Sequence, residues 1–337
     1  MLYSFGLVKH ANVRYRDTVR HLSRCELVSM LRSISIDSDV YEESLGGCDF
    51  LSFESRCITP DEISYLSGHS SVSFMAENNK GLLRPLIFQS GNYMEDDLPE
   101  ILKYKGKTSA SFTRMMLNTA RALSAAPFPE TPATVLDPMC GKATTCFCAL
   151  QSGMNAVGLD LDSKAIREAV DYFSRYLRFH MLKHDMQKKS ETSGNHSVPY
   201  TEFRFSQSRE QYRQNDIRTL KLGTCDTADS YSMCRKSLAQ LIIADLPYGI
   251  QHAPQFGAKP ESFSVLLKRA LPVWKKCLAP GGIIAVSFNT LTFPTKDVDR
   301  IAVSSGLSIV DDPLYANLAH EVEQSVVRNV RFFTNNP

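Results

Sequence analysis

The sequence predicts an α/β protein in which a mostly parallel sheet carries helices on both faces, preceded by a small α+β unit. From Val135 to the end, apolar strand-like runs alternate with helical segments, as they do in βαβ units. Three of these strands end in a carboxylate, at Asp137, Asp160 and Asp245. The 337 residues are enough for two domains, and we expect these to cover residues 1–93 and 94–337.

The first ninety residues predict a small sheet with two helices on one face. Short β-like runs mark the strands, and apolar residues at helical spacing mark the helices. The expected strands are Leu2–Val8, Asp49–Phe53, Ser71–Phe74 and Leu83–Phe88, and the expected helices are Thr18–Arg32 and Pro60–Leu66. A polar, hinge-like stretch at Gln89–Asp97 then separates this unit from the rest of the chain.

The second part begins with a helix that Ser109 is placed to cap and that runs to Leu123. The strands expected after it are the runs TVLDP, AVGLD, LIIAD and IIAVSF, each followed by a helical segment except the last. Leu307–Thr334 reads as two strands, which we expect to form an antiparallel hairpin at the edge of the sheet.

One polar segment interrupts this rhythm. Lys183–Tyr200 lacks periodicity, so we expect a mobile surface loop there. From Lys164 to Lys221 the chain has 12 Lys/Arg against 7 Asp/Glu, an excess of 12 − 7 = 5 positive charges. This excess is either a solvated loop face or a patch that contacts phosphates.

Composition excludes several classes of protein. Hydrophobic residues make up 43% and charged residues 22%, which is globular, and the net charge of +2 points to no partner by itself. No apolar run approaches the ~18 residues of a membrane span, and no signal sequence is evident, so we expect no membrane partner. The 9 cysteines contain no C-x-x-C pair, which favours reduced thiols in a cytoplasmic protein and no metal site.

The first candidate site is the turn after the strand that ends at Asp137. The run DPMCGKATT contains small residues at the start of a helix, where a ligand can lie against backbone N–H groups. Asp160 follows 160 − 137 = 23 residues later, close to the spacing at which a carboxylate binds ribose hydroxyls. Only Gly141 of the expected glycines is present and Ala143 stands in place of another, which argues against a dinucleotide. The pattern therefore indicates a site for an adenosine-containing ligand.

The second candidate site is Leu241–Gly249, a fully apolar strand that ends in ADLPYG. Its C-terminal end is where open α/β sheets place their chemistry. Asp245 would accept a hydrogen bond there, Pro247 would stiffen the loop, and Tyr248 would offer a flat face. Such a set suits a planar substrate that carries an exocyclic amine.

With these motifs the chain resembles the class I S-adenosylmethionine-dependent methyltransferases of the D/N-P-P-Y group. The likeness is greatest to the RNA guanine-N2 methyltransferases, including the THUMP-associated tRNA guanosine-10 enzymes. It is carried by DPMCGKATT, GLDLD and ADLPYG, with YKGKTS at Tyr104–Ser109 as a pre-motif segment, and it covers residues 97–337. It implies a Rossmann-like methyltransferase sheet and S-adenosyl-L-methionine as the cofactor.

The resemblance also implies a role for particular residues. Asp160 would bind the ribose hydroxyls and Asp216 would lie near the adenine amine. The full set expected to bind the cofactor is Thr108, Asp137, Met139, Gly141, Thr144, Asp160 and Asp216. The set expected to hold the target base and carry catalysis is Asp245, Leu246, Pro247 and Tyr248.

Three features depart from the family pattern. Leu246 replaces the first proline of D-P-P-Y, and Ala143 replaces a glycine. The first ninety residues do not resemble a THUMP domain, so another module would have to position RNA. The implied partner is RNA, with tRNA first and rRNA second, and an activator subunit is a further expected partner. The alternatives are a DNA adenine-N6 methyltransferase, a cofactor- and RNA-binding protein that has lost catalysis, and methylation of a protein or small molecule.

Overall fold

The computed structural model describes most of the chain. The described residues are 1–8, 13–87, 91–102, 107–193, 196–234, 238–247, 255–256, 259–260, 262–323 and 325–335. Within this part of the chain the elements form two separate sheets, with a further two-stranded ribbon formed by β12 (Gln255–Phe256) and β13 (Lys259–Pro260).

The N-terminal unit is an antiparallel sheet of five strands in the order β2-β3-β1-β4-β5. Its elements are β1 (Leu2–Leu7), α1 (Val13–Ser33), β2 (Tyr41–Leu45), β3 (Cys48–Glu54), α2 (Pro60–Leu66), β4 (Val72–Asn79) and β5 (Leu82–Pro85). The succession βαββαβ, with β1 between β3 and β4, is the ferredoxin-like arrangement. The sequence reading missed β2, whose residues are largely exposed and show no apolar alternation.

Helices α1 and α2 cover one face of this small sheet, as the sequence predicts. Phe5 of β1 and Phe53 of β3 are fully buried and pack with Leu27 of α1 and Leu66 of α2 in one cluster. Helix α2 begins with a capping box in which Thr59 and Glu62 satisfy each other's backbone N–H groups. The unit therefore has a small hydrophobic core of its own.

The larger sheet has its strands in the order β15-β17-β14-β11-β6-β7-β10-β9-β8. Its strands are β6 (Thr134–Asp137), β7 (Asn155–Asp160), β8 (Lys183–Ser193), β9 (His196–Ser206), β10 (Arg218–Thr224), β11 (Ala239–Asp245), β14 (Leu278–Asn289), β15 (Ser308–Ile309), β16 (His320–Glu323) and β17 (Val326–Thr334). The five strands β10-β7-β6-β11-β14 are parallel, and numbered along the chain they read 3-2-1-4-5, the doubly wound Rossmann order. The predicted fold class is thus confirmed.

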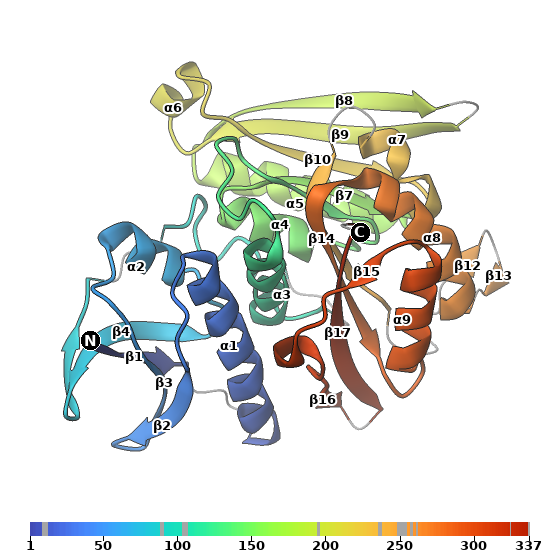
Figure 1. Ribbon diagram of the computed structural model, residues 1–337. Coiled ribbons are helices and arrows are strands. Elements are labelled where there is room, and N and C mark those ends of the chain that lie inside the picture. The colour runs from blue at the N-terminus through green and yellow to red at the C-terminus, as the bar shows by residue number, and fades with distance from the viewer. Residues whose placement is uncertain are drawn as a thin grey trace.

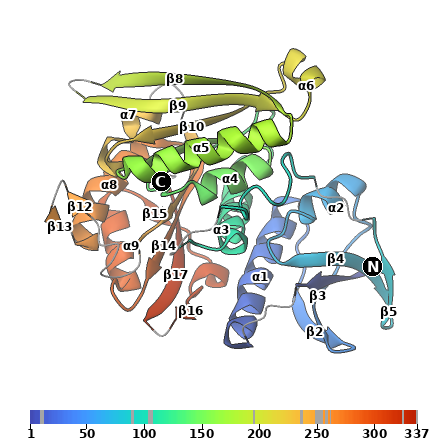
Figure 2. The ribbon, with the colours of Figure 1, turned by 180° about the vertical axis from the view of Figure 1, so that it is seen from behind.

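Helices lie on both faces of the larger sheet (Figures 1 and 2). One hydrophobic cluster joins one face to α3 (Ala110–Leu123), α4 (Thr144–Gln151) and α5 (Ser163–Phe179). A second cluster joins the other face to α7 (Tyr231–Cys234), α8 (Phe263–Cys277) and α9 (Thr295–Ser304). The remaining short helices are α6 (Arg209–Arg213), η1 (Thr227–Asp229) and η3 (Pro313–Tyr315).

The loop expected at Lys183–Tyr200 is wrong, because the structure forms a long antiparallel hairpin of β8 and β9 there. Strand β9 pairs with β10, and its residues Phe203 and Phe205 are fully buried against α5. Strand β8 is the outermost strand of the sheet and is largely exposed, so its sequence can be polar. Tertiary pairing therefore supplies the structure that the local pattern did not indicate.

The C-terminal region is antiparallel, as predicted, but its order differs from a simple edge hairpin. Strand β17 pairs with β14 on one side and with β15 on the other, so it lies inside the sheet. Strand β16 pairs with β17 as well, and Arg328 faces His320 in that register. No helix among the described residues has the length and apolar character needed to cross a bilayer.

The two sheets meet where α1 packs along α3, near the centre of Figure 1. The fully buried carboxylate of Glu26 in α1 accepts hydrogen bonds from the Asn118 amide at 2.7 Å and from the Ser70 backbone N–H at 2.8 Å. Leu22 and Cys25 of α1 belong to the hydrophobic cluster of the larger sheet. The N-terminal unit is therefore joined to the rest by a packed interface with a polar centre.

Candidate active site

The carboxyl ends of the parallel strands meet along one edge of the larger sheet. Asp137 ends β6 opposite Gly158, and Asp160 ends β7 opposite Thr224 at the end of β10. Asp245 ends β11 on the other side of β6. The topology thus brings to one edge three carboxylates that lie far apart in the sequence, which is the position of ligand sites in open α/β sheets.

The turn after β6 is held by these carboxylates. Asp137 accepts from the N–H of Met139 at 3.1 Å, and Asp160 accepts from the N–H of Gly141 at 2.7 Å. The second oxygen of Asp160 accepts from the N–H of Asp162 at 2.8 Å. The loop and the end of β7 are therefore fixed to each other through one side chain.

Two residues of this turn adopt the left-handed conformation. Gly141 has a φ of 51° and Ala143, the residue before α4, has a φ of 69°. A Cβ built on Gly141 would meet no described atom within 4 Å, so there is open space beside this backbone. Thr144, the first residue of α4, is buried, and Met139 packs against the second hydrophobic cluster. The predicted residues of the turn thus lie close together in the chain, with open space beside Gly141.

Burial raises the pKa of the two carboxyl groups. Asp137 is 3% exposed, and this burial raises its pKa to about 7, although hydrogen bonds from Thr145 and Met139 oppose the shift. Burial also raises the pKa of Asp160, again against hydrogen bonds from the backbone N–H groups of Asp162 and Gly141. Charge repulsion from Asp160 and Asp245 adds to the rise at Asp137.

Asp245 is held by a residue from the segment before α3. The hydroxyl of Thr108 donates to its Oδ2, while its Oδ1 is buried and has no hydrogen-bond partner in the described part of the chain. A buried oxygen without a hydrogen-bond donor lowers stability unless a bound ligand supplies the donor. Its presence in a fold therefore calls for an explanation. Ser109 caps α3 directly after Thr108 and thereby fixes the position of that hydroxyl.

Leu246 is 1% exposed and belongs to the second hydrophobic cluster, and its N–H donates to the carbonyl of Ser287 at 2.9 Å. Its side chain therefore anchors the start of the loop to the hydrophobic cluster. Pro247 follows, half-buried. Tyr248 lies outside the described residues.

Asp216 is not part of this cluster, and the structure does not bring it together with the other residues predicted to bind the cofactor. Strand β10 begins at Arg218, two residues after it, so Asp216 lies at the opposite edge of the sheet from Thr224. There its carboxylate accepts from Arg218 at 2.5 Å and its carbonyl accepts from the hydroxyl of Tyr93 at 3.2 Å. The sequence predicts no strand at this point, and the resemblance alone places Asp216 near the cofactor.

The acidic residue that does follow β10 is Asp226, which the sequence reading missed. Its carboxylate accepts from the N–H of Ala228 at 2.8 Å and from both terminal nitrogens of Arg269 at 3.1 and 3.2 Å. The alternation of Leu220 and Leu222 before it was the available signal for the strand. Thr108 was assigned to the cofactor, and its contact with Asp245 could not be seen in the sequence. Among the described residues no cluster of side chains suits a metal ion.

Comparison with known proteins gives fold-level similarities only. No protein-family model matches the chain, and no curated protein does. Among solved structures, a TehB-like SAM-dependent methyltransferase from Corynebacterium glutamicum is 16% identical over 62% of this chain and 83% of its own, with a TM-score of 0.37. TrmN from Thermus thermophilus is 15% identical over 90% of this chain and 64% of its own, with a TM-score of 0.40.

A putative RNA methyltransferase from Pyrococcus horikoshii is 10% identical over 70% of this chain and 93% of its own, with a TM-score of 0.39. Similarities at this level carry no argument about this chain. Its fold class rests on its own strand order, and its candidate site rests on the contacts at the sheet edge.

Proposed function

We propose that this chain is an S-adenosylmethionine-dependent methyltransferase that methylates an exocyclic amine of a base in RNA, in first place guanine N2 of tRNA or rRNA. The observation that carries the proposal is the Oδ1 of Asp245, which is buried and has no hydrogen-bond partner among the described residues. It lies at the same sheet edge as the turn around Gly141. An acceptor to which no described residue donates suits a substrate that brings an N–H group.

The turn after β6 fits the cofactor. Open space beside Gly141 leaves room for a ligand against the backbone, and Met139 and Thr144 border the same turn. The carboxylate of Asp160 accepts two backbone N–H groups, and a carboxylate has about four acceptor positions, so it retains the capacity to accept from ribose hydroxyls. Asp137 stabilises the turn by accepting a hydrogen bond from the N–H of Met139.

The chemistry required of the protein is mainly positioning. When bound, S-adenosylmethionine supplies a methyl group on a sulfonium, which transfers by in-line displacement. Asp245 accepts one N–H of the target amine and so directs the nitrogen lone pair, while Thr108 holds the other oxygen of the carboxylate. A strong base is unnecessary because the amine proton is lost after the N–C bond has formed.

RNA is the proposed substrate class because ADLPYG resembles the motif of RNA guanine-N2 enzymes and because a small ferredoxin-like unit precedes the catalytic part. We assign residues 94–337 to the methyltransferase domain and residues 1–93 to positioning of the RNA.

The test is transfer of tritiated methyl groups from S-adenosylmethionine to tRNA, rRNA and genomic DNA, followed by nucleoside analysis. We expect N2-methylguanosine in RNA. N6-methyladenine in DNA would instead show a DNA enzyme. Cofactor binding without transfer to any of the three would contradict the proposal for the chain alone, and co-purification would then seek an activator subunit.

A further inference from the structure

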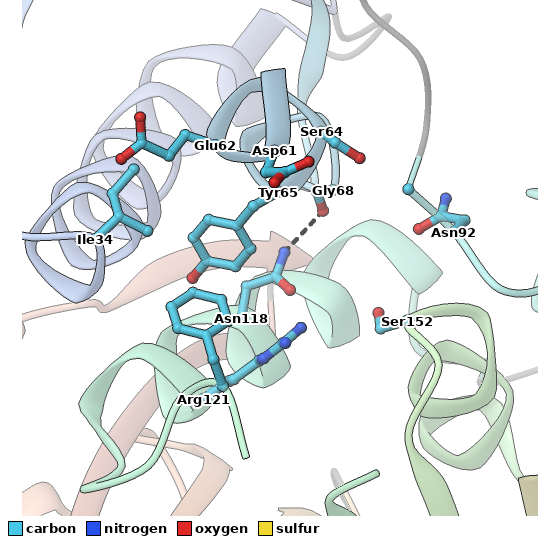
Figure 3. Close-up of a pocket in the computed structure, with 12 residues that line it drawn as sticks. Ile34, Asp61, Glu62, Ser64, Tyr65, Gly68, Asn92, Asn118, Arg121 and Ser152 are labelled. Carbon is cyan, nitrogen blue, oxygen red and sulfur yellow. Dashed lines mark hydrogen bonds between the residues drawn. The ribbon is translucent and has the colours of Figure 1, made fainter. Parts of the chain in front are cut away.

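A cavity of about 410 Å³ lies between the N-terminal unit and the far ends of α3 and α4 (Figure 3). Small-molecule sites have volumes of roughly 300–1,000 Å³. Its lining includes Tyr65 of α2, Asn118 and Arg121 of α3, Phe128, and Ser152 at the end of α4. The cavity is separate from the candidate active site, which lies at the other end of α3.

Asn118 presents an acceptor to this cavity. The side chain is 5% exposed, and its amide nitrogen donates to Glu26 at 2.7 Å and to the carbonyl of Gly68 at 2.8 Å. Because both partners are acceptors, they fix the amide so that the nitrogen faces them. Figure 3 shows the nitrogen directed to Gly68 and the oxygen on the other side. In the described part of the chain this oxygen has no hydrogen-bond partner.

Arg121 presents donors beside that acceptor, because residues three apart are neighbours on a helix. Its Nε donates to the carbonyl of Pro127 at 2.8 Å, and its two terminal nitrogens make no hydrogen bond or ion pair with the described residues. The guanidinium lies 5.6 Å from the ring centre of Tyr65 and 5.2 Å from that of Phe128. The two rings meet edge to face with their centres 4.8 Å apart.

The set therefore consists of a donor beside an acceptor, next to aromatic rings of which Phe128 is 47% exposed. A purine matches both parts: adenine offers an acceptor at N7 beside donors at N6, and its ring can stack on an aromatic face. The acids Asp61 and Glu62 also line the cavity, and Glu62 already pairs with Arg56 at 2.6 Å. An uncharged base suits these surroundings better than a phosphate or a carboxylate.

We propose that this cavity binds one unpaired purine of the RNA, an inference that rests on the proposed function. Arg121 and Asn118 hydrogen-bond the edge of the base, and Phe128 stacks against its ring. The recognised base is distinct from the methylated base, because Thr108 and Asp245 lie beyond the N-terminal end of α3 whereas Arg121 is in its last turn.

The test compares binding of fluorescently labelled oligoadenylate and oligouridylate of equal length. We expect Phe128→Ala to weaken oligoadenylate binding at least fivefold, about 1 kcal/mol, because a stacked base is lost. Arg121→Lys keeps the charge but loses the planar set of donors, so it too should weaken oligoadenylate binding. The matched control is Phe179→Ala, an 82% exposed phenylalanine at the end of α5, which should leave both affinities unchanged.

Thermal unfolding checks that each variant is folded, and the exposure of Phe128 makes its loss tolerable. Unchanged oligoadenylate affinity in both Phe128→Ala and Arg121→Lys would overturn the proposal. A fivefold loss in both, with cofactor affinity unchanged by calorimetry, would support it.

The same variants separate this proposal from the proposed function. If the wild type methylates RNA and Phe128→Ala has the same KM for RNA, the cavity proposal fails and the methyltransferase proposal stands. If the wild type transfers no methyl group to RNA, but Phe128→Ala binds oligoadenylate more weakly than the wild type does, the cavity proposal stands and the proposed function fails.

Discussion

Among single residues, Asp245 has the contacts that matter most for the proposed chemistry. Asp245→Ala should abolish methyl transfer, because the acceptor for the target amine and the partner of Thr108 both disappear. Cofactor affinity should stay within about tenfold, since the turn at Gly141 and Asp160 is untouched. Transfer of labelled methyl and calorimetry measure the two effects, with the exposed Asp171→Ala as a control. A variant of Asp245 with near wild-type transfer would refute this role.

The raised pKa of Asp137 should make the free energy of unfolding depend on pH. Its pKa is about 7 in the folded protein and about 3.9 in an unfolded chain, so folding takes up a proton between these values. The stability it contributes is present below about pH 4 and is lost as the pH rises through 7. Urea denaturation of Asp137→Asn between pH 4 and 7 should therefore show a smaller loss of stability with rising pH than the wild type. Parallel curves would contradict the assignment.

Ala143 occupies a backbone conformation that favours glycine. The left-handed conformation costs an L-residue about 1–2 kcal/mol of stability, and a glycine at this position would avoid that cost. The glycine would also make the unfolded chain more flexible, which lowers the free energy of unfolding by about 0.4–1 kcal/mol. Ala143→Gly should thus raise the free energy of unfolding by between about 0 and 1.6 kcal/mol. Ala143→Val, β-branched at a fully buried position, should lower it by more than about 2 kcal/mol, as measured by urea denaturation. A destabilising Ala143→Gly would show that the methyl group packs better than its strain costs.

Single residues also show how far the sequence could lead. Asp137, Asp160 and Asp245 could be placed together because each ends an apolar strand, and parallel strands bring such ends to one edge. The edge of the sheet at which Asp216 lies could not be derived from the sequence, because a shift of a few residues in the limits of β10 moves an acid from one edge to the other. The contact of Thr108 with Asp245 joins segments 137 residues apart, which no local pattern indicates.

Among the elements, the β8–β9 hairpin is held to the rest of the sheet mainly through its inner strand, β9. Phe203 is fully buried 5.1 Å from Phe173, and its cross-strand partner Met186 is 44% exposed. Phe203→Ala should lower the free energy of unfolding by about 3–5 kcal/mol, because a buried phenylalanine leaves a cavity. Met186→Ala should change it by less than about 1 kcal/mol in the same chemical denaturation experiment. Equal losses would mean that the edge strand β8 contributes as much to stability as the inner strand β9.

The exposure of β8 also explains why some strands were not predicted from the sequence. Strands β6, β7, β11 and β14 are apolar because helices cover both faces, and their sequences show it. Strands β2 and β8 lie at the edges of their sheets and are largely exposed, so neither alternation nor an apolar run marks them. Pairing with a neighbour, which is a property of the fold, makes them strands.

In the whole molecule, the two sheets are coupled through a buried carboxylate. Glu26 is 0% exposed and is bound by Asn118 and Ser70. Glu26→Ala should lower the free energy of unfolding by at least about 3 kcal/mol, because donors in the interface lose their acceptor. The exposed Glu42→Ala should remain within about 0.5 kcal/mol. Similar midpoints in urea for both variants would show that the interface contributes little.

The same interface changes what a truncation would report. Removing residues 1–90 takes away α1 and α2, and with them the apolar cover of α3 and the partner of Asn118. A truncated chain should therefore unfold at lower temperature in calorimetry, before any question of RNA affinity arises. Substitutions in the full chain are the sounder route to the role of the N-terminal unit, and an unaltered melting temperature after truncation would reverse this view.

Helix α3 has 14 residues and is therefore about 21 Å long, and it runs from beside Thr108 to the cavity at Arg121. A packed helix does not shorten or stretch, so it acts as a molecular ruler between the two places. An RNA that fills both must hold its purine and its target nucleotide a fixed distance apart. The distance between the two bases would then decide which RNAs are substrates. A nucleotide inserted between them would move the target nucleotide away from Asp245.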